Sequence, residues 1–200
     1  MDLLVIRHGQ SEADILGVIE GRADYPLTEL GYKQAKAMAK WLKEHYSISK
    51  IYSSPLKRAR QTAEQISNTY DIEIQYDDDL MEWNNGLIAG LSRKEADEKY
   101  PELKKNPHTR VYEQESHIDF RSRAETALSK IVNENSNDET IAIVSHGGAI
   151  NMLFRSFIES PLNSKITVLT GDTGIHHWRI RDNNKSIIYA GKDEHLKHMI

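Results

Sequence analysis

Leu3-Leu4-Val5-Ile6-Arg7-His8-Gly9 is a short apolar run that ends directly in an arginine, a histidine and a glycine. Such a run predicts a buried strand, with Arg7 and His8 at its carboxyl end. A second run, Ile141-Ala142-Ile143-Val144, ends in Ser145-His146-Gly147-Gly148. Open α/β sheets bind ligands beyond the carboxyl ends of their parallel strands. The two runs therefore predict that two strands deliver His8 and His146 to one edge of a sheet.

Strand-like and helix-like segments alternate along the rest of the chain. The expected strands lie at residues 2–6, 50–53, 72–76, 141–144, 175–180 and 186–190. Such alternation is typical of a mostly parallel sheet covered by helices on both faces. We therefore expect an α/β protein, a three-layer α/β/α sandwich around a mostly parallel central sheet.

Capping patterns mark where the expected helices begin. A short polar side chain at the N-cap can accept a hydrogen bond from the first turn, and proline suits the first helical position. The expected starts are Thr28, Ser54-Pro55, Ser92 with Glu95, about residue 118, and His146. The segment 104–116 has the weakest pattern and predicts a surface loop; whether it acts as a lid stays open.

Composition limits the class of protein. The chain has 200 residues, a formal charge of -4 and no cysteine. This length suits a single domain over residues 1–200, with a small cap or lid around 84–117 left open. No basic excess favours nucleic acid, and cysteine chemistry is excluded. The longest uncharged apolar stretch, residues 141–154, is shorter than the roughly 20 residues that cross a bilayer. We expect a cytoplasmic protein without nucleic-acid or membrane partners; its oligomeric state stays open.

Three expected junctions between a strand and a helix carry cations and free backbone amides. Arg7 and His8 follow the first strand, Arg58 follows the second, and His146-Gly147 follows the later one. Arginine matches phosphate oxygens with two parallel hydrogen bonds, and helix starts present unpaired N–H groups to anions. The three junctions together predict a phosphate site.

The ordered motifs resemble those of the histidine phosphatase superfamily, also called the phosphoglycerate mutase-like fold. The similar segments, in chain order, are 7–11, 21–31, 53–63, 80–90, 115–123 and 144–148. A lone Arg-His-Gly is weak evidence, whereas six ordered segments over most of the chain are specific. The resemblance implies the phosphoglycerate mutase-like version of the three-layer fold.

The resemblance also implies roles for individual residues. His8 would be the nucleophile that forms a phosphohistidine, and Glu82 would be the general acid. Three further groups would surround the phosphoryl oxygens: Arg7, Arg58 and His146. Additional substrate contacts would come from Gln10, Ser11, Glu20, Gly21 and Gly147. Ser11 is equally well explained as a helix N-cap.

No metal or cofactor is implied, and the histidines and carboxylates show no convincing ligand spacing. Asp14 stands where many members of the family have asparagine, which puts a carboxylate near a site for a dianion. We expect Asp14 to face away from the ligand or to pair with a cation such as Arg22.

The expected activity is that of a metal-independent phosphomonoesterase acting on small phosphorylated metabolites, with a phosphoprotein as the less favoured substrate. One alternative is a cofactor-dependent phosphoglycerate mutase, which shares the catalytic core. Mutases of this family keep water out with an inserted segment that includes adjacent arginines. Here the stretch 90–120 is short, and its Arg93 and Arg110 are not adjacent. The resemblance therefore implies a more open site that admits water, which disfavours the mutase. A second alternative is a non-catalytic module that binds a phosphorylated ligand, which would not need both histidines and the acid. The physiological substrate stays open.

Overall fold

The computed structural model describes residues 1–101, 110–182 and 184–197. Within these residues six strands form one sheet in the order β3-β2-β4-β1-β5-β6. The strands are β1 (Asp2–Arg7), β2 (Lys50–Ser53), β3 (Ile74–Tyr76), β4 (Thr140–Ser145), β5 (Ile175–Arg181) and β6 (Asn184–Lys192). Strand β4 pairs in parallel with β1 and β2, and β2 pairs in parallel with β3, whereas β5 and β6 are antiparallel. The prediction of a mostly parallel central sheet is confirmed.

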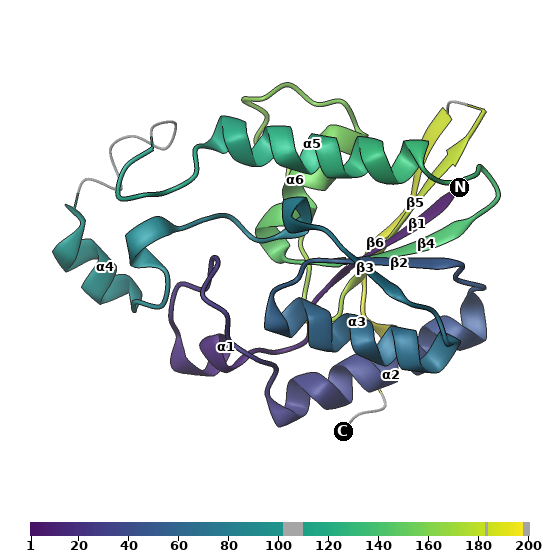
Figure 1. The fold of residues 1–200 in the computed structure, drawn as a ribbon, viewed down its shortest axis with the longest axis horizontal. Helices are drawn as coiled ribbons and strands as arrows, with labels where there is room; N and C mark the ends of the chain where they lie inside the picture. Colours follow the sequence, from purple (N-terminus) through teal and green to yellow (C-terminus); the bar gives the residue numbers. More distant parts are fainter. Residues whose placement is uncertain (102–109, 183, 198–200) are drawn as a thin grey trace.

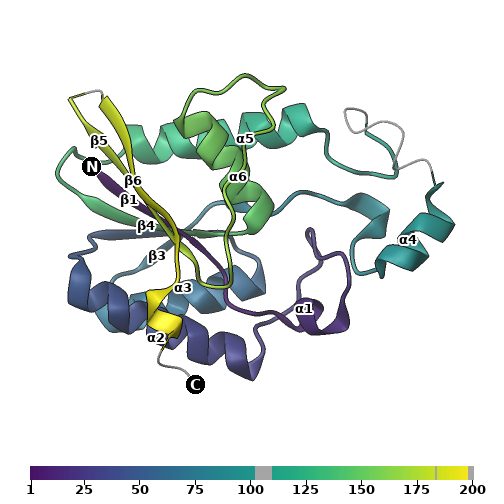
Figure 2. The ribbon, with the colours of Figure 1, turned by 180° about the vertical axis from the view of Figure 1, so that it is seen from behind.

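Helices cover both faces of the sheet (Figure 1). The α-helices are α1 (Glu12–Leu16), α2 (Glu29–His45), α3 (Lys57–Tyr70), α4 (Arg93–Lys99), α5 (His117–Asn133) and α6 (Gly147–Phe157). Short 3-10 turns occur at η1 (Asp78–Leu80), η2 (Gly86–Ile88) and η4 (Glu194–Leu196). Figures 1 and 2 show α2 and α3 on one face and α5 and α6 on the other, with η4 beside α2.

Successive residues of β1 enter different halves of the core, because side chains alternate across a strand. Leu3 and Val5 pack in the cluster that includes α5 and α6, whereas Leu4 and Ile6 pack in the cluster that includes α2 and α3. This double burial explains why the strand is a continuous apolar run. It also holds the end of β1, where Arg7 and His8 lie, between two packed layers.

The expected caps at Thr28 and Ser92 are confirmed, since each side chain accepts a hydrogen bond from the first turn of its helix. The expected helix start at Ser54-Pro55 is wrong: α3 begins at Lys57, after an N-cap at Leu56. Ser54 instead lies in the preceding turn, where its hydroxyl oxygen accepts from the Leu56 amide. The same hydroxyl contacts His146, so a long-range contact uses the group that was expected to cap the helix.

The region 84–117 contains η2 and α4, which lie at one end of the molecule beside α1 (Figure 1). The Leu87 amide donates to the Tyr112 carbonyl, which links η2 to the segment that leads into α5. Residues 102–109, which make up much of the loop expected at 104–116, are outside the described residues. The cap and lid therefore stay predictions.

A charge cluster around Asp2 holds the other end of β1. Its carboxylate accepts from His177, Arg179 and Arg181. Burial alone would raise the pKa of Asp2, but hydrogen bonds from His177 and Arg179 prevail and lower the pKa to about 2. His177 therefore has a structural contact far along β1 from His8.

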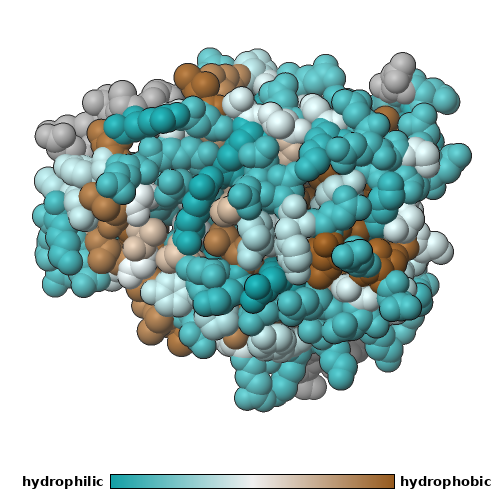
Figure 3. Space-filling model, viewed as in Figure 1, coloured by the Kyte–Doolittle hydropathy of each residue, from teal (hydrophilic) through white to brown (hydrophobic). Residues whose placement is uncertain are grey.

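On the face shown in Figure 3, hydrophobic residues form separate clusters among hydrophilic ones. Among the described helices, none is long and apolar enough to cross a membrane.

Candidate active site

The carboxyl ends of β1 and β4 lie side by side, with Arg7 paired in register with Ser145. His8 and His146 are the next residues, and their ring centroids lie 5.1 Å apart. Strand β2 ends next to β4, which brings the turn before α3 to the same place. The two histidines therefore meet at one sheet edge, as the apolar runs predict.

His8 is buried, with 1% of its surface exposed. Its Nδ1 lies 2.7 Å from the Gly9 carbonyl oxygen. Because a carbonyl only accepts, Nδ1 must carry the proton, so Nε2 of the neutral ring is unprotonated and keeps its lone pair. Burial, followed by the charges of Arg58 and Arg7, holds the pKa of His8 well below its usual value. His8 is therefore a neutral imidazole at neutral pH, with Nε2 available as a nucleophile.

Arg58 is fully buried on α3. Its two terminal nitrogens donate to the carbonyls of Ala23 and Gly21, at 3.0 and 2.8 Å. Its Nε donates to His8 Nε2 at 3.3 Å. These contacts direct one N–H group of a buried cation at His8 Nε2, where it could also stabilise a phosphoryl oxygen.

Arg7 reaches the site from β1 and contacts two carboxylates. Its terminal nitrogen lies 3.6 Å from Asp14 and 3.5 Å from Asp172. Asp14 therefore pairs with a cation, as one of the two expectations had it, but the cation is Arg7; Arg22 lies 4.0 Å from Glu115 instead. Asp14 also completes the capping box of α1. The capping geometry explains its orientation without any contact to a ligand.

His146 is also fully buried, and its Nε2 lies 2.8 Å from the Ser54 hydroxyl. Its Nδ1 is buried and has no hydrogen-bond partner in the described part of the chain. Burial, then the charges of Arg58 and His8, holds the pKa of His146 well below its usual value. A neutral His146 that accepts from Ser54 would present Nδ1–H as a donor, which suits a phosphoryl oxygen.

Glu82 lies against the first turn of α6. One carboxylate oxygen accepts from the Gly148 amide at 2.8 Å, and the other accepts from its neighbour Trp83 at 2.7 Å. A Cβ atom at position 148 would lie 2.3 Å from the carboxylate. Only glycine at 148 therefore allows the acid to sit this close to the helix start.

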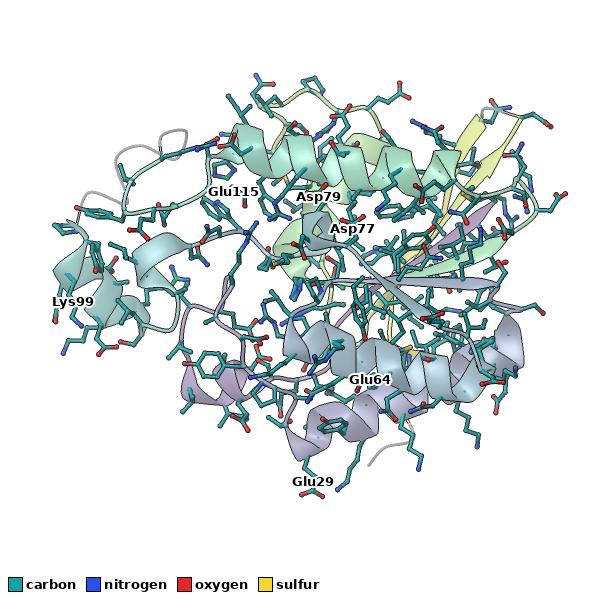
Figure 4. The ribbon with its side chains drawn as sticks, viewed as in Figure 1. Glu29, Glu64, Asp77, Asp79, Lys99 and Glu115 are labelled. Atoms are coloured by element: carbon teal, nitrogen blue, oxygen red, sulfur yellow. The ribbon has the colours of Figure 1, made fainter. Side chains whose placement is uncertain are left out.

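The backbone around Glu82 is clamped by Arg123 of α5. This guanidinium donates to three carbonyls, those of Asp79, Met81 and Glu82, at 2.6 to 2.9 Å. It also forms an ion pair with Glu115 at 2.6 Å, and Glu115 accepts from the Asn84 amide. Figure 4 labels Glu115 beside the start of α5 and Asp79 in η1. The clamp joins α5 to both sides of the acid.

A cavity of about 540 Å³ opens beside these groups. Its lining residues include Glu20, Gly21 and Glu82, together with Arg93 of α4 and Arg155 of α6. A pocket of this size suits a small metabolite.

The other expected substrate contacts differ in where they point. Gln10 faces α2: its amide oxygen accepts from Thr28 at 2.9 Å and its backbone N–H donates to Gln34. Ser11 is an N-cap, which was one of its two interpretations, and its hydroxyl also contacts Glu20. Gly147 opens α6 with free space at its Cβ position.

Sequence reasoning missed Ser54 as the partner of His146 and Asp172 as a partner of Arg7. Neither residue has a local signal, because each partner lies far away in the chain. Glu115 and Arg123 are the first and last residues of the similar segment 115–123, and their spacing of eight residues across a helix start is the sequence signal for their pairing. Among the described residues, no group of three or more histidine, aspartate or glutamate side chains is placed to hold a metal ion.

Comparison with known proteins agrees with this geometry. The model of the histidine phosphatase superfamily (branch 1) matches residues 3–191. Phosphoserine phosphatase 1 of Hydrogenobacter thermophilus is 35% identical over 150 residues, which is 72% of this chain and 70% of the relative. A broad-specificity phosphatase of Saccharomyces cerevisiae is 31% identical over 97% of this chain and 86% of its own length.

A solved structure supports the same assignment. A phosphoserine phosphatase mutant of Entamoeba histolytica, in complex with phosphoserine, is 28% identical, has a TM-score of 0.80 and is covered over 98% of both chains. The family match, the phosphatase relatives and the shared fold lead to one conclusion: this chain belongs to the histidine phosphatase superfamily and is a phosphatase that uses a histidine nucleophile.

Proposed function

We propose that this chain hydrolyses phosphomonoesters of small metabolites, without a metal ion, through a phosphohistidine at His8. The observation that carries the proposal is the state of His8: its Nδ1 is bound to the Gly9 carbonyl, so Nε2 keeps its lone pair 3.3 Å from Arg58 Nε. A nucleophile beside a fixed cation is what phosphoryl transfer requires, because its catalysis rests on positioning and charge stabilisation.

In the first step His8 Nε2 attacks phosphorus, and the bond from phosphorus to the leaving oxygen breaks. Glu82 gives its proton to that oxygen, so the product leaves as a neutral alcohol. Arg7, Arg58 and the Nδ1–H group of His146 stabilise the charge that spreads over the three equatorial oxygens.

In the second step a water molecule attacks the phosphohistidine. Glu82, now charged, takes a proton from this water, and the bond from phosphorus to Nε2 breaks to release phosphate. The amides of Gly148 and Trp83 keep the same carboxylate in place for both steps.

The cavity and the relatives both support a small phosphorylated metabolite as the substrate. The cavity volume of about 540 Å³ suits a small leaving group, and its lining includes Arg93 and Arg155 as well as Glu20. Charged groups of both signs suit a leaving group that itself carries charge. Two relatives are named phosphoserine phosphatases, so phosphoserine is the first substrate to test.

The test is a panel of phosphorylated metabolites ranked by kcat/KM, assayed with and without a metal chelator. We expect small phosphomonoesters to be hydrolysed, with no loss of rate in the chelator. Interconversion of phosphoglycerates faster than phosphate release would contradict the proposal. A hydrolysis rate that is lost in the chelator and restored by a divalent cation would also contradict it.

We expect Arg123 to act as a positioning residue for Glu82. The Arg123→Lys variant keeps the charge but cannot make the three carbonyl contacts. It should lower kcat for phosphoserine or glycerol phosphate about tenfold or more, because these leaving groups need the proton of the acid. Hydrolysis of para-nitrophenyl phosphate should fall much less, since nitrophenolate leaves without a proton.

The matched control is Arg60→Lys. Arg60 is an exposed arginine of α3 that pairs with Glu64. It should leave both rates unchanged. An equal loss for both kinds of leaving group in Arg123→Lys would indicate a structural role only.

A further inference from the structure

The carboxylate of Glu20 lies inside the group of residues expected to bind phosphate. It is 3.4 Å from Arg58 Nε and 3.8 Å from His8 Nε2, and its other oxygen accepts from the Ser11 hydroxyl. Only 17% of its side chain is exposed. A carboxylate therefore occupies the position against Arg58 where an anionic ligand would be expected.

Glu20 also separates the nucleophile from the cavity. Glu20 is a lining residue of the cavity, whereas His8 and Arg58 are not and are almost completely buried. A phosphorus atom poised for attack would lie about 3 to 3.5 Å from Nε2. This position overlaps or adjoins the present position of the Glu20 carboxylate, so a phosphoryl dianion and a charged Glu20 cannot both occupy the site without strong repulsion.

The groups around Glu20 are of both signs. Two cations face its carboxylate, Arg7 from the end of β1 and Arg58 from α3. His8 faces it from the residue after β1, and the Ser11 hydroxyl and Asp14 face it from the start of α1. Burial raises the pKa of Glu20, while Arg58 and Ser11 lower it and Asp14 raises it further, and the outcome is a raised pKa. A proton on Glu20 is therefore easier to gain than on an exposed glutamate, and a nearby dianion would favour it further.

We propose that Glu20 is protonated when the phosphoryl group binds and donates a hydrogen bond to a phosphoryl oxygen, and that charged Glu20 excludes anions from the free enzyme. The inference rests on the proposed function, since it concerns the same phosphate site. Its consequence is that anion binding takes up a proton, so affinity rises as pH falls toward the pKa of Glu20.

Sulfate is the probe for this proposal, because it is a tetrahedral dianion that does not titrate near neutral pH and is not turned over. We expect Glu20→Gln to bind sulfate about tenfold more tightly than the wild type at about pH 7.5, because proton-coupled binding loses up to tenfold per pH unit above the pKa. The difference should shrink toward about pH 5, where wild-type Glu20 gains its proton more easily. Calorimetric titration measures the affinity directly.

Two comparisons separate the charge of Glu20 from other effects. Glu12→Gln removes an exposed carboxylate of α1 and should change sulfate affinity less than about twofold at both pH values. Calorimetry of the wild type in buffers of different ionisation enthalpy should show proton uptake with sulfate, and this uptake should be lost or reduced in Glu20→Gln. The wild-type measurement stands even if the variant does not fold.

The proposal is overturned if Glu20→Gln binds sulfate no more tightly than the wild type at about pH 7.5. It is also overturned if the wild type takes up no proton, or if the uptake persists unchanged in Glu20→Gln, which would assign it to His8 or His146. Absence of sulfate binding in both proteins at both pH values would contradict the anion site itself, and with it the proposed function.

Discussion

Replacement of His8 by alanine is expected to remove phosphatase activity almost completely, with kcat lowered by at least about 10³-fold. The reason is that Nε2 is the group that would form the bond to phosphorus. In the described part of the chain, His8 is the imidazole whose unprotonated Nε2 accepts from Arg58 Nε. The measurement is phosphate release from phosphoserine and para-nitrophenyl phosphate, with the phosphorylated enzyme trapped in wild type by an alkaline quench.

His8→Ala opens a space in a buried site, so loss of activity could follow from loss of structure. His8→Asn is the matched variant, because its side-chain amide can still donate to the Gly9 carbonyl in place of Nδ1. We expect both variants to keep the circular dichroism spectrum and sulfate binding while losing turnover. A folded His8→Asn protein with the wild-type rate would contradict the assignment of the nucleophile.

The second large effect is expected for Glu82→Gln. General acid catalysis contributes about 10²- to 10⁴-fold, and kcat for phosphoserine should fall by an amount in this range. A glutamine side chain has one acceptor oxygen, so it can keep the contact with the Gly148 amide or the contact with the Trp83 amide, and its NH2 group then faces the other backbone N–H. The variant loses the proton and one of the two anchoring contacts. Because nitrophenolate leaves without a proton, the first step with para-nitrophenyl phosphate should still slow far less than the first step with phosphoserine.

Pre-steady-state kinetics distinguish the two steps for Glu82→Gln. With para-nitrophenyl phosphate, fast release of nitrophenolate followed by slow turnover would indicate that hydrolysis of the phosphohistidine has become limiting, as expected if Glu82 also activates water. Equal losses for both substrates, without a burst, would assign Glu82 a structural role. The Arg123→Lys variant should show a weaker form of the same pattern, because it displaces the acid without removing it.

Carboxylates of this chain pair with the arginines of the site. Arg7 lies near Asp14 and Asp172, and Arg58 lies near Glu20. These carboxylates offset the repulsion between the two arginines. Any phosphorylated ligand must compete with these carboxylates for the arginines. The affinity of the site for anions is therefore lower than the two arginines alone would give.

Much of the fold is predictable from local patterns. Strands β1 and β4 are apolar runs because both of their faces are buried, and Thr28 and Ser92 cap their helices through contacts within three residues. The start of α3 was mispredicted because Ser54 bonds to His146, which lies 92 residues away. A capping pattern cannot report a competing partner at that separation.

The sequence by itself determined the alternation of strands and helices, the motif residues at the strand ends, and the membership in a phosphatase family. Tertiary structure decided what surrounds them: Glu20 against Arg58 and His8, Asp172 beside Arg7, and the Arg123 clamp on the acid. The physical reason is the difference in sequence separation between the interacting residues. Periodicity and capping act over a few residues, whereas these contacts join segments far apart in the sequence that the strand order of the sheet brings together.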